Sequence, residues 1–207
     1  MTNSKIARAA AAGLGALLLC GVGAMAWADD GTHLDDQDQN VALLLNIESL
    51  GALTLSVAED EVELTEGVSL DPTQRVFTGT LHNVTVTDTR DPAAIDDDVY
   101  WYVVGQVTDF SAVGLPDIPA LNLGWAPFLD SDVDPDEVAA GPGVTPYLDD
   151  PTGGFGTVGG KEMFAYTDNS NGVAPGSWTG SADLTLKTGV AVAAGDYEAT
   201  LTLSLFE

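Results

Sequence analysis

Alternation of apolar and polar residues is the strongest pattern in this chain. In the segment 197–206, YEATLTLSLF, apolar residues occupy every second position and polar residues fill the positions between them. Shorter segments repeat the pattern at 53–57 (LTLSV), 62–64 (VEL), 84–88 (VTVTD) and 183–187 (DLTLK). Successive side chains of a β-strand point to opposite faces, so each segment predicts a strand with one buried face.

Turn-forming residues separate these segments. Asp, Pro, Gly and Asn gather in strings such as DPTQ, TRDPAA, DDPTGG and DNSNG, which are typical of turns. No segment after the N-terminal region has a helical apolar stripe, although PDEVAAG (135–141) could form a single helical turn. Many short strands without intervening helices predict an all-β fold, an antiparallel β-sandwich of the Greek-key or immunoglobulin-like type.

The N-terminal region has the composition of a secretory signal peptide. Lys5 and Arg8 precede the apolar run AAAAGLGALLLCGVGAMA, and the small residues of AMA and AWA offer two cleavage sites. We expect a signal-peptide helix at 1–28, an acidic disordered leader at 29–40 and one sandwich domain at 41–207. A retained anchor is the alternative, but no later segment is apolar and long enough to span a bilayer, so we expect no transmembrane anchor after signal removal. The protein should be secreted, to the extracellular space or the cell surface.

Cysteine usage agrees with export. Cys20 is the only cysteine and lies within the apolar run, so the mature chain should contain neither a thiol nor a disulfide. Leu19 precedes it where a lipoprotein signal needs a small residue. Many secreted eukaryotic domains are stapled by disulfides, so a cysteine-free exported β-rich chain favours a bacterial source.

The chain is strongly acidic. It has 32 Asp and Glu against six Lys and Arg, a formal net charge of −26. Two of the six cations lie in the signal, so four cations against 32 acids leave the mature chain at −28. Such a field repels nucleic acid and anionic polymers and attracts cations and basic partners. We expect no nucleic-acid partner, and solubility in a salty exterior is the simplest role of the charge.

Aromatic residues supply the first candidate binding site. In YWYVVGQVTDF (100–110), Trp101 shares a strand face with two valines, which predicts burial, whereas the flanking tyrosines share the opposite face. Trp125 follows an apolar turn in NLGWAPF, and Trp178 precedes a strand in GSWTGSADLTL. Exposed rings could stack on sugars or fill a pocket of a partner, whereas buried rings would only form the core. The candidate binding residues are Tyr100, Tyr102, Trp125 and Trp178.

An acidic loop supplies the second candidate. In DSDVDPDE (130–137), four aspartates alternate with other residues, and Ca²⁺ prefers several oxygen ligands. The EF-hand pattern fails, because Pro135 replaces the turn glycine and Gly141 stands where the bidentate glutamate belongs. The alternative to a Ca²⁺ site is a solvated loop, and no other cofactor is expected. The candidate metal ligands are Asp130, Asp132, Asp134 and Asp136.

Catalytic motifs find little support. His82 is the one histidine outside the leader, and no nucleophile elbow accompanies it. GFGTVG (154–159) matches a dinucleotide-binding string, but it lacks the strand and helix that such a site requires. We therefore expect a protein that is not an enzyme.

Several segments read together resemble the WxL-type cell-surface domain of Gram-positive bacteria, in the divergent form of high-GC species. They are LGALTLSV, VTVTDTR, YWYVVGQVTDF, NLGWAPF, GSWTGSADLTLKTG and AAGDYEATLTLSLFE, from about residue 50 to the C-terminus. The markers are a T-D-T-R turn before an aromatic strand, a later Trp segment and a Gly-Asp-Tyr lead into the last strand. The strict Trp-x-Leu is absent, and Trp101-Tyr102-Val103 is the nearest match.

The resemblance implies a secreted, non-catalytic β-sandwich that associates non-covalently with peptidoglycan, the cell wall or another surface protein. Two alternatives remain open. The chain could be a structural subunit of an extracellular filament or layer, a homo-oligomer built by donating its last strand to a neighbouring sheet. It could also be a secreted carbohydrate-binding module that uses the aromatic residues.

Overall fold

The computed structural model describes residues 51–156 and 160–207. The predicted signal peptide, the predicted leader and residues 41–50 of the predicted sandwich domain lie outside the described residues. No helix in the described part of the chain is long and apolar enough to cross a membrane.

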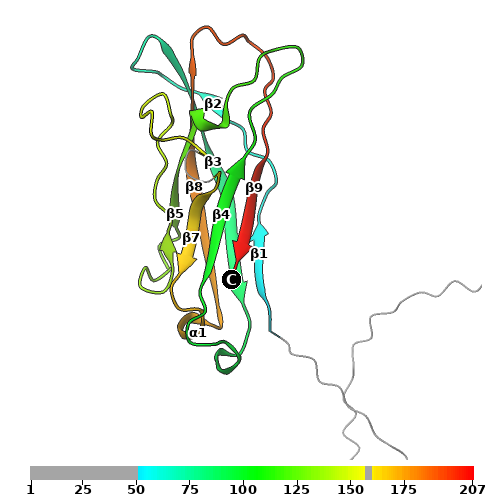
Figure 1. Cartoon of the computed structure of the whole chain (residues 1–207), viewed down its shortest axis with the longest axis vertical. Helices are drawn as coiled ribbons and strands as arrows, with labels where there is room; N and C mark the ends of the chain where they lie inside the picture. The colour runs from blue at the N-terminus through cyan, green and yellow to red at the C-terminus, as the bar shows by residue number, and fades with distance from the viewer. Residues whose placement is uncertain (1–50, 157–159) are drawn as a thin grey trace, which may run out of the picture. The chain divides into compact units, whose positions relative to one another are not determined.

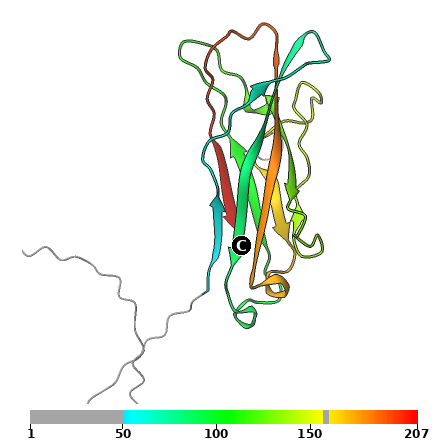
Figure 2. The same cartoon turned by 180° about the vertical axis from the view of Figure 1, so that it is seen from behind.

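Two antiparallel sheets pack face to face (Figures 1 and 2). Sheet A has the order β1-β3-β8-β5, with β2 paired to the outer side of β3, and sheet B has the order β6-β7-β4-β9. The all-β antiparallel sandwich expected from the sequence is thereby confirmed. The strands are β1 (Leu53–Val57), β2 (Thr65–Glu66), β3 (Gln74–Asp88), β4 (Trp101–Val107), β5 (Leu123–Leu129), β6 (Ala139–Ala140), β7 (Glu162–Thr167), β8 (Gly176–Gly189) and β9 (Leu201–Phe206).

The alternating segments all lie in or beside strands, but their bounds differ from those of the strands. The segment 197–206 begins before β9, which has six residues. β1 has the predicted bounds, whereas 84–88 and 183–187 are parts of β3 and β8, which have 15 and 14 residues. The segment 62–64 precedes β2 and is not itself a strand. The helical turn considered at 135–141 is present only in its first part, where the backbone N–H groups of Glu137 and Val138 donate to the carbonyl of Asp134, and β6 follows at Ala139–Ala140. Short helical turns occur elsewhere, as η1 (Pro92–Ala94), η2 (Ala120–Asn122) and α1 (Ser170–Val173).

Three buried indoles hold the two sheets together. The rings of Trp101 from sheet B and Trp178 from sheet A lie 5.5 Å apart between centroids. Trp125 contacts Phe155 and Phe164 at 4.7 and 5.8 Å. A Cβ added to Gly105 would lie 2.7 Å from Cη2 of Trp125, so the glycine lets the indole approach the backbone of β4. These large apolar contacts explain how a cysteine-free domain is stabilised.

A charged clamp closes one end of the sandwich. The Asp88 carboxylate is buried, with 1% of the residue exposed, and accepts hydrogen bonds from the Nε and Nη2 of Arg90 at 2.9 and 2.7 Å. Nη1 of Arg90 donates to the carboxylate of Glu207. Burial acts to raise the pKa of Asp88, but the hydrogen bonds and charge of Arg90 outweigh it and hold that pKa below its ordinary value of 3.8. The T-D-T-R turn therefore joins the end of β3 to the end of β9.

Candidate functional site

The outer face of sheet B is apolar and aromatic. Alternation along β4, β7 and β9 sends Trp101 and Val103 inward and places the residues between them on the outer face. The cross-strand register aligns Tyr166, Tyr102 and Phe206 in one row and Met163, Val104 and Ser204 in the next. In the described residues of these strands, no Asp, Glu, Lys or Arg occupies this face. We call the following set the aromatic face: Tyr100, Tyr102, Val104, Met163, Tyr166 and Phe206.

Three rings of the aromatic face form a column. Tyr100 and Tyr102 have ring centroids 6.1 Å apart and an interplanar angle of 24°, and Tyr102 and Phe206 are 5.3 Å apart at 17°. Tyr100 is 54% exposed and Phe206 is also exposed, while Tyr102 between them is half-buried. The column thus places a continuous aromatic surface in contact with solvent, in the stretch 100–102 where the sequence predicted it.

The stacking of these rings limits what the column can bind. Nearly parallel rings at 5.3 Å cannot lie side by side in one plane without a clash, so their faces overlap in an offset stack. A sugar needs an exposed ring face on which to lie. The outer faces of the two end rings, Tyr100 and Phe206, are free of the other rings, but Nζ of Lys161 lies over the Phe206 ring. Tyr100 is thus the ring best placed to receive a sugar, and the column is better suited to contacts with apolar side chains.

Lys161 crosses the aromatic face. Its Nζ lies 4.7 Å from the ring centroid of Phe206. Lys161 precedes β7 and Phe206 belongs to β9, and β4 lies between these two strands, so the lysine side chain reaches over β4. Arg75, Arg90 and Lys187 each form an ion pair with a carboxylate. The contact of Lys161 shows that this face accepts a cationic side chain on a ring, in a cation–π interaction.

Acidic residues border the aromatic face at one end. Asp96, Asp97 and Asp98 are exposed and precede Tyr100 in the chain. Glu207 follows Phe206 and is also exposed, although its carboxylate already accepts a hydrogen bond from Arg90. An aromatic centre with a carboxylate border is complementary to an apolar surface flanked by Lys or Arg.

Two of the four predicted binding residues are not accessible. Trp125 is 2% exposed and Trp178 is 5% exposed, and both belong to the hydrophobic core. The prediction that they contribute a binding surface is therefore wrong. Trp178 lies within β8 rather than ahead of a strand, and its inward position follows from the pairing of Val86 with Trp178. Tyr100 and Tyr102 remain as candidates.

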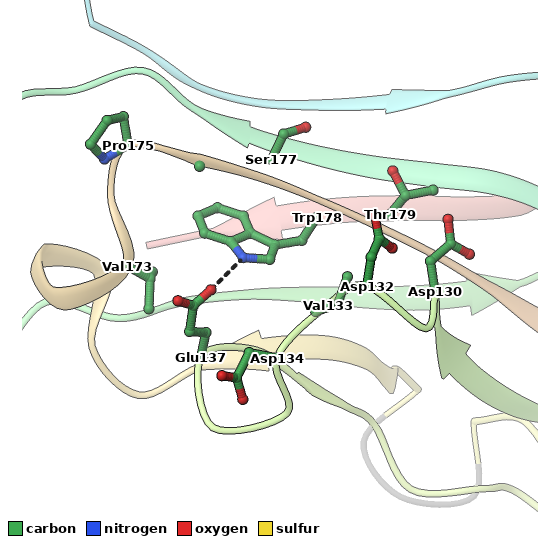
Figure 3. Close-up of a pocket in the computed structure, with 11 residues that line it drawn as sticks. Asp130, Asp132, Val133, Asp134, Glu137, Val173, Pro175, Ser177, Trp178 and Thr179 are labelled. Atoms are coloured by element: carbon green, nitrogen blue, oxygen red, sulfur yellow. Dashed lines mark hydrogen bonds between the residues drawn. The ribbon is translucent and has the colours of Figure 1, made fainter.

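The acidic loop surrounds a pocket but does not form a metal site. A cavity of about 400 Å³ lies between the residues 130–137 and the start of β8 (Figure 3). Asp134 and Glu137 lie apart from Asp130 and Asp132 in this view. Among the described residues, no three acidic, His or Cys side chains come close enough to hold a metal ion.

Two acidic side chains of this loop form hydrogen bonds within the protein. The Asp134 carboxylate accepts a hydrogen bond from the backbone N–H of Asp136 at 2.9 Å. The indole N–H of Trp178 donates to Glu137 at 3.5 Å. The predicted Ca²⁺ ligands are therefore a turn cap and solvated carboxylates, which contradicts the calcium interpretation.

Sequence reasoning missed Lys161, Tyr166 and Phe206. The alternation of β9 placed Leu201, Leu203 and Leu205 on the buried face, and those leucines do pack against the core. Phe206 was not considered for the opposite face, although the same period places it there. Its proximity to Tyr102 depends on the pairing of β9 with β4, which a single sequence does not contain.

No family model, no curated protein and no solved structure matches the chain.

Proposed function

We propose that the protein is a non-enzymatic, secreted cell-surface protein that associates non-covalently with the cell wall or with a companion surface protein through the aromatic face. The observation that carries the proposal is the exposed column of Tyr100, Tyr102 and Phe206 on an otherwise strongly acidic chain. Contiguous exposed aromatic surface is uncommon on soluble domains that bind nothing. The signal-peptide pattern and the resemblance to WxL-type domains support a location at the cell surface.

The charge favours a protein partner over the wall itself. A chain with a formal charge of −26 is repelled by anionic wall polymers unless a cation or a basic partner bridges them. A companion protein with apolar side chains between Lys and Arg residues would match both the ring column and its carboxylate border. We therefore place the companion surface protein first and peptidoglycan second.

The carbohydrate-binding alternative rests on the free outer face of Tyr100. A sugar could stack there, whereas Lys161 lies over the Phe206 ring and the facing sides of the three rings contact one another. This alternative predicts a signal on a glycan array that is lost in Tyr100→Ala and retained in Phe206→Ala.

The test is retention on purified cell walls and on wall-free surface extracts. Tyr102→Ala should lower retention about tenfold, because it removes the central ring of the column. Thr85→Ala on the outer face of sheet A is the matched control and should leave retention unchanged. High salt should weaken retention if the partner is basic. Equal retention of both variants, or no retention of the native protein on either material, would contradict the proposal.

A further inference from the structure

The strands β1 and β9 lie side by side along one lateral edge of the sandwich (Figures 1 and 2). β1 is the last strand of sheet A on this side and β9 is the last strand of sheet B. In the described part of the chain, no further strand pairs with the outer side of either. Both sheets therefore end in an open edge at the same place.

The hydrogen-bond pattern identifies the backbone groups at this edge. The N–H of Thr108 donates to the carbonyl of Thr200, so alternation turns the N–H and C=O of Leu201, Leu203 and Leu205 away from β4. The N–H of Thr89 donates to the carbonyl of Ala52 in the same way. On β1 the groups at the open edge are those of Leu53, Leu55 and Val57.

Nothing in the two edge strands hinders pairing. β1 reads LTLSV and β9 reads LTLSLF, so both share the tetrapeptide LTLS and neither contains a charge or a proline. The opposite lateral side is protected. β5 contains Pro127, its Trp125 exchanges backbone hydrogen bonds with Val144, and β6 has only two residues. Natural sheets blunt exposed edges with these devices, and β1 and β9 lack them.

We propose that the β1/β9 edge pairs with the same edge of a second copy of this chain. A two-fold axis perpendicular to the sheets would pair β1 with β1 and β9 with β9 of the partner, each antiparallel, and would continue both sheets through the dimer. Identical uncharged strands meet in this arrangement, so no carboxylate of an acidic chain enters the contact. The proposal concerns a different surface from the aromatic face and goes beyond the proposed function.

The alternation of β9 restricts the register of this contact. Opposite residues of an antiparallel pair point to the same face, so outward residues must meet outward residues. The axis must therefore pass through a residue rather than between two residues. For most of the six-residue strand to be paired, that residue must be near its middle. The candidates are Thr202, Leu203 and Ser204.

The first test is sedimentation of the mature chain over a range of concentrations. The native protein should form a dimer, more tightly at about 0.5 M NaCl than at low salt, because salt screens the repulsion between two acidic copies. The double variant Val57→Glu with Thr202→Glu adds a negative charge to each edge strand of both copies. It should weaken the dimer at least about tenfold. Val57 is 41% exposed and Thr202 is exposed, so the fold should persist in circular dichroism.

The second test uses the cysteine-free mature chain and does not depend on the glutamate variants. Thr202→Cys or Ser204→Cys should yield a disulfide-linked dimer under mild oxidation, since paired strands bring Cα atoms within reach of a disulfide. Ala126→Cys on the protected edge strand β5 is the control and should form no disulfide-linked dimer. A native protein that sediments as a monomer at every concentration, with no disulfide dimer at 202 or 204, would overturn the proposal.

A third outcome would identify a different occupant. The apolar run VALLLNI at 41–47 lies just before β1 in the sequence. If Leu44→Cys combined with Ser204→Cys forms a disulfide within one chain, this run covers the edge and the dimer is excluded. Wall retention is measured separately, so failure of the dimer leaves the proposed function standing, and the reverse also holds.

Discussion

The two outer faces of the sandwich have opposite characters. The outer face of sheet A is lined with hydroxyls that hydrogen-bond across strands, Thr85 to Thr179 at 2.9 Å and Thr87 to Ser177 at 3.1 Å. The outer face of sheet B carries Tyr100, Tyr102 and Phe206 in a column that ends in solvent. The hydroxyls on the outer face of sheet A pair with one another, whereas the outer face of sheet B leaves apolar surface exposed. This difference is the reason for proposing sheet B as the surface that contacts other molecules.

The largest expected effect concerns the clamp that joins the ends of the two sheets. Arg90→Ala leaves the buried Asp88 carboxylate without its partner and should lower the free energy of unfolding by about 3 kcal/mol. Arg75→Ala removes an exposed ion pair with Glu66, which water and salt screen, and should lower the free energy of unfolding much less. Denaturant unfolding measures both values. In Arg90→Ala, backbone hydrogen exchange should quicken in β9 before it does in β3. Equal losses of unfolding free energy in the two variants would contradict a larger stabilising role for the Arg90 clamp.

A smaller expected effect compares the contributions of the two outer faces to the free energy of unfolding. Tyr102→Ala removes a half-buried ring from the column and should cost about 2 kcal/mol of unfolding free energy. Thr179→Ala removes one cross-strand hydroxyl pair and should cost about 0.5 kcal/mol. Tyr102 would then combine a packing role with its proposed binding role. A cost for Thr179→Ala as large as that for Tyr102→Ala would mean that the hydroxyl face is not merely support.

The smallest expected effect concerns how folding stability depends on pH, to which Asp88 and Glu162 contribute with opposite signs. The pKa of Asp88 lies below 3.8, so its stabilisation is present above that value and is lost as pH falls through the lower folded value. Burial raises the pKa of Glu162 above 4.5, although the backbone N–H of Gly156 acts to lower it. Stability from Glu162 is therefore highest below pH 4.5 and is lost as pH rises through the raised value.

The variant Glu162→Gln isolates the second contribution. Measured by urea unfolding, it should become more stable relative to the native protein as pH rises from about 4 to about 7. Acid unfolding near and below pH 3.8 should remain, because Asp88 is unchanged. A stability difference between the variant and the native protein that does not vary with pH would show that the pKa of Glu162 is not raised in the folded state.

Period-two alternation predicted the sandwich well because it records which face of a strand is buried. It placed Trp101 inward and Tyr102 outward, as the structure has them. It failed for Trp125 and Trp178, since neither lies in a clean alternating segment and their burial depends on strands far away in sequence. The acidic residues at 130–137 alternate within a loop, where alternation does not bring carboxylates together.

The sequence predicts only part of the aromatic face, because the rest of it depends on pairing between strands. Tyr100 and Tyr102 are neighbours on one strand, so their shared face can be read from the sequence. Phe206 and Tyr166 join them only through the pairing of β9 and β7 with β4. Pairing between strands depends on the whole fold, and the alternation within each segment does not reveal it.

The three buried indoles between the sheets also give the domain an intrinsic fluorescence signal for its folded state. Trp101, Trp125 and Trp178 are shielded from water and in contact with other rings. Their fluorescence should be emitted at short wavelength in the folded protein and shift to longer wavelength when the sheets separate. A spectroscopist therefore needs no attached dye to follow either sheet, because a single native signal arises where both of them meet.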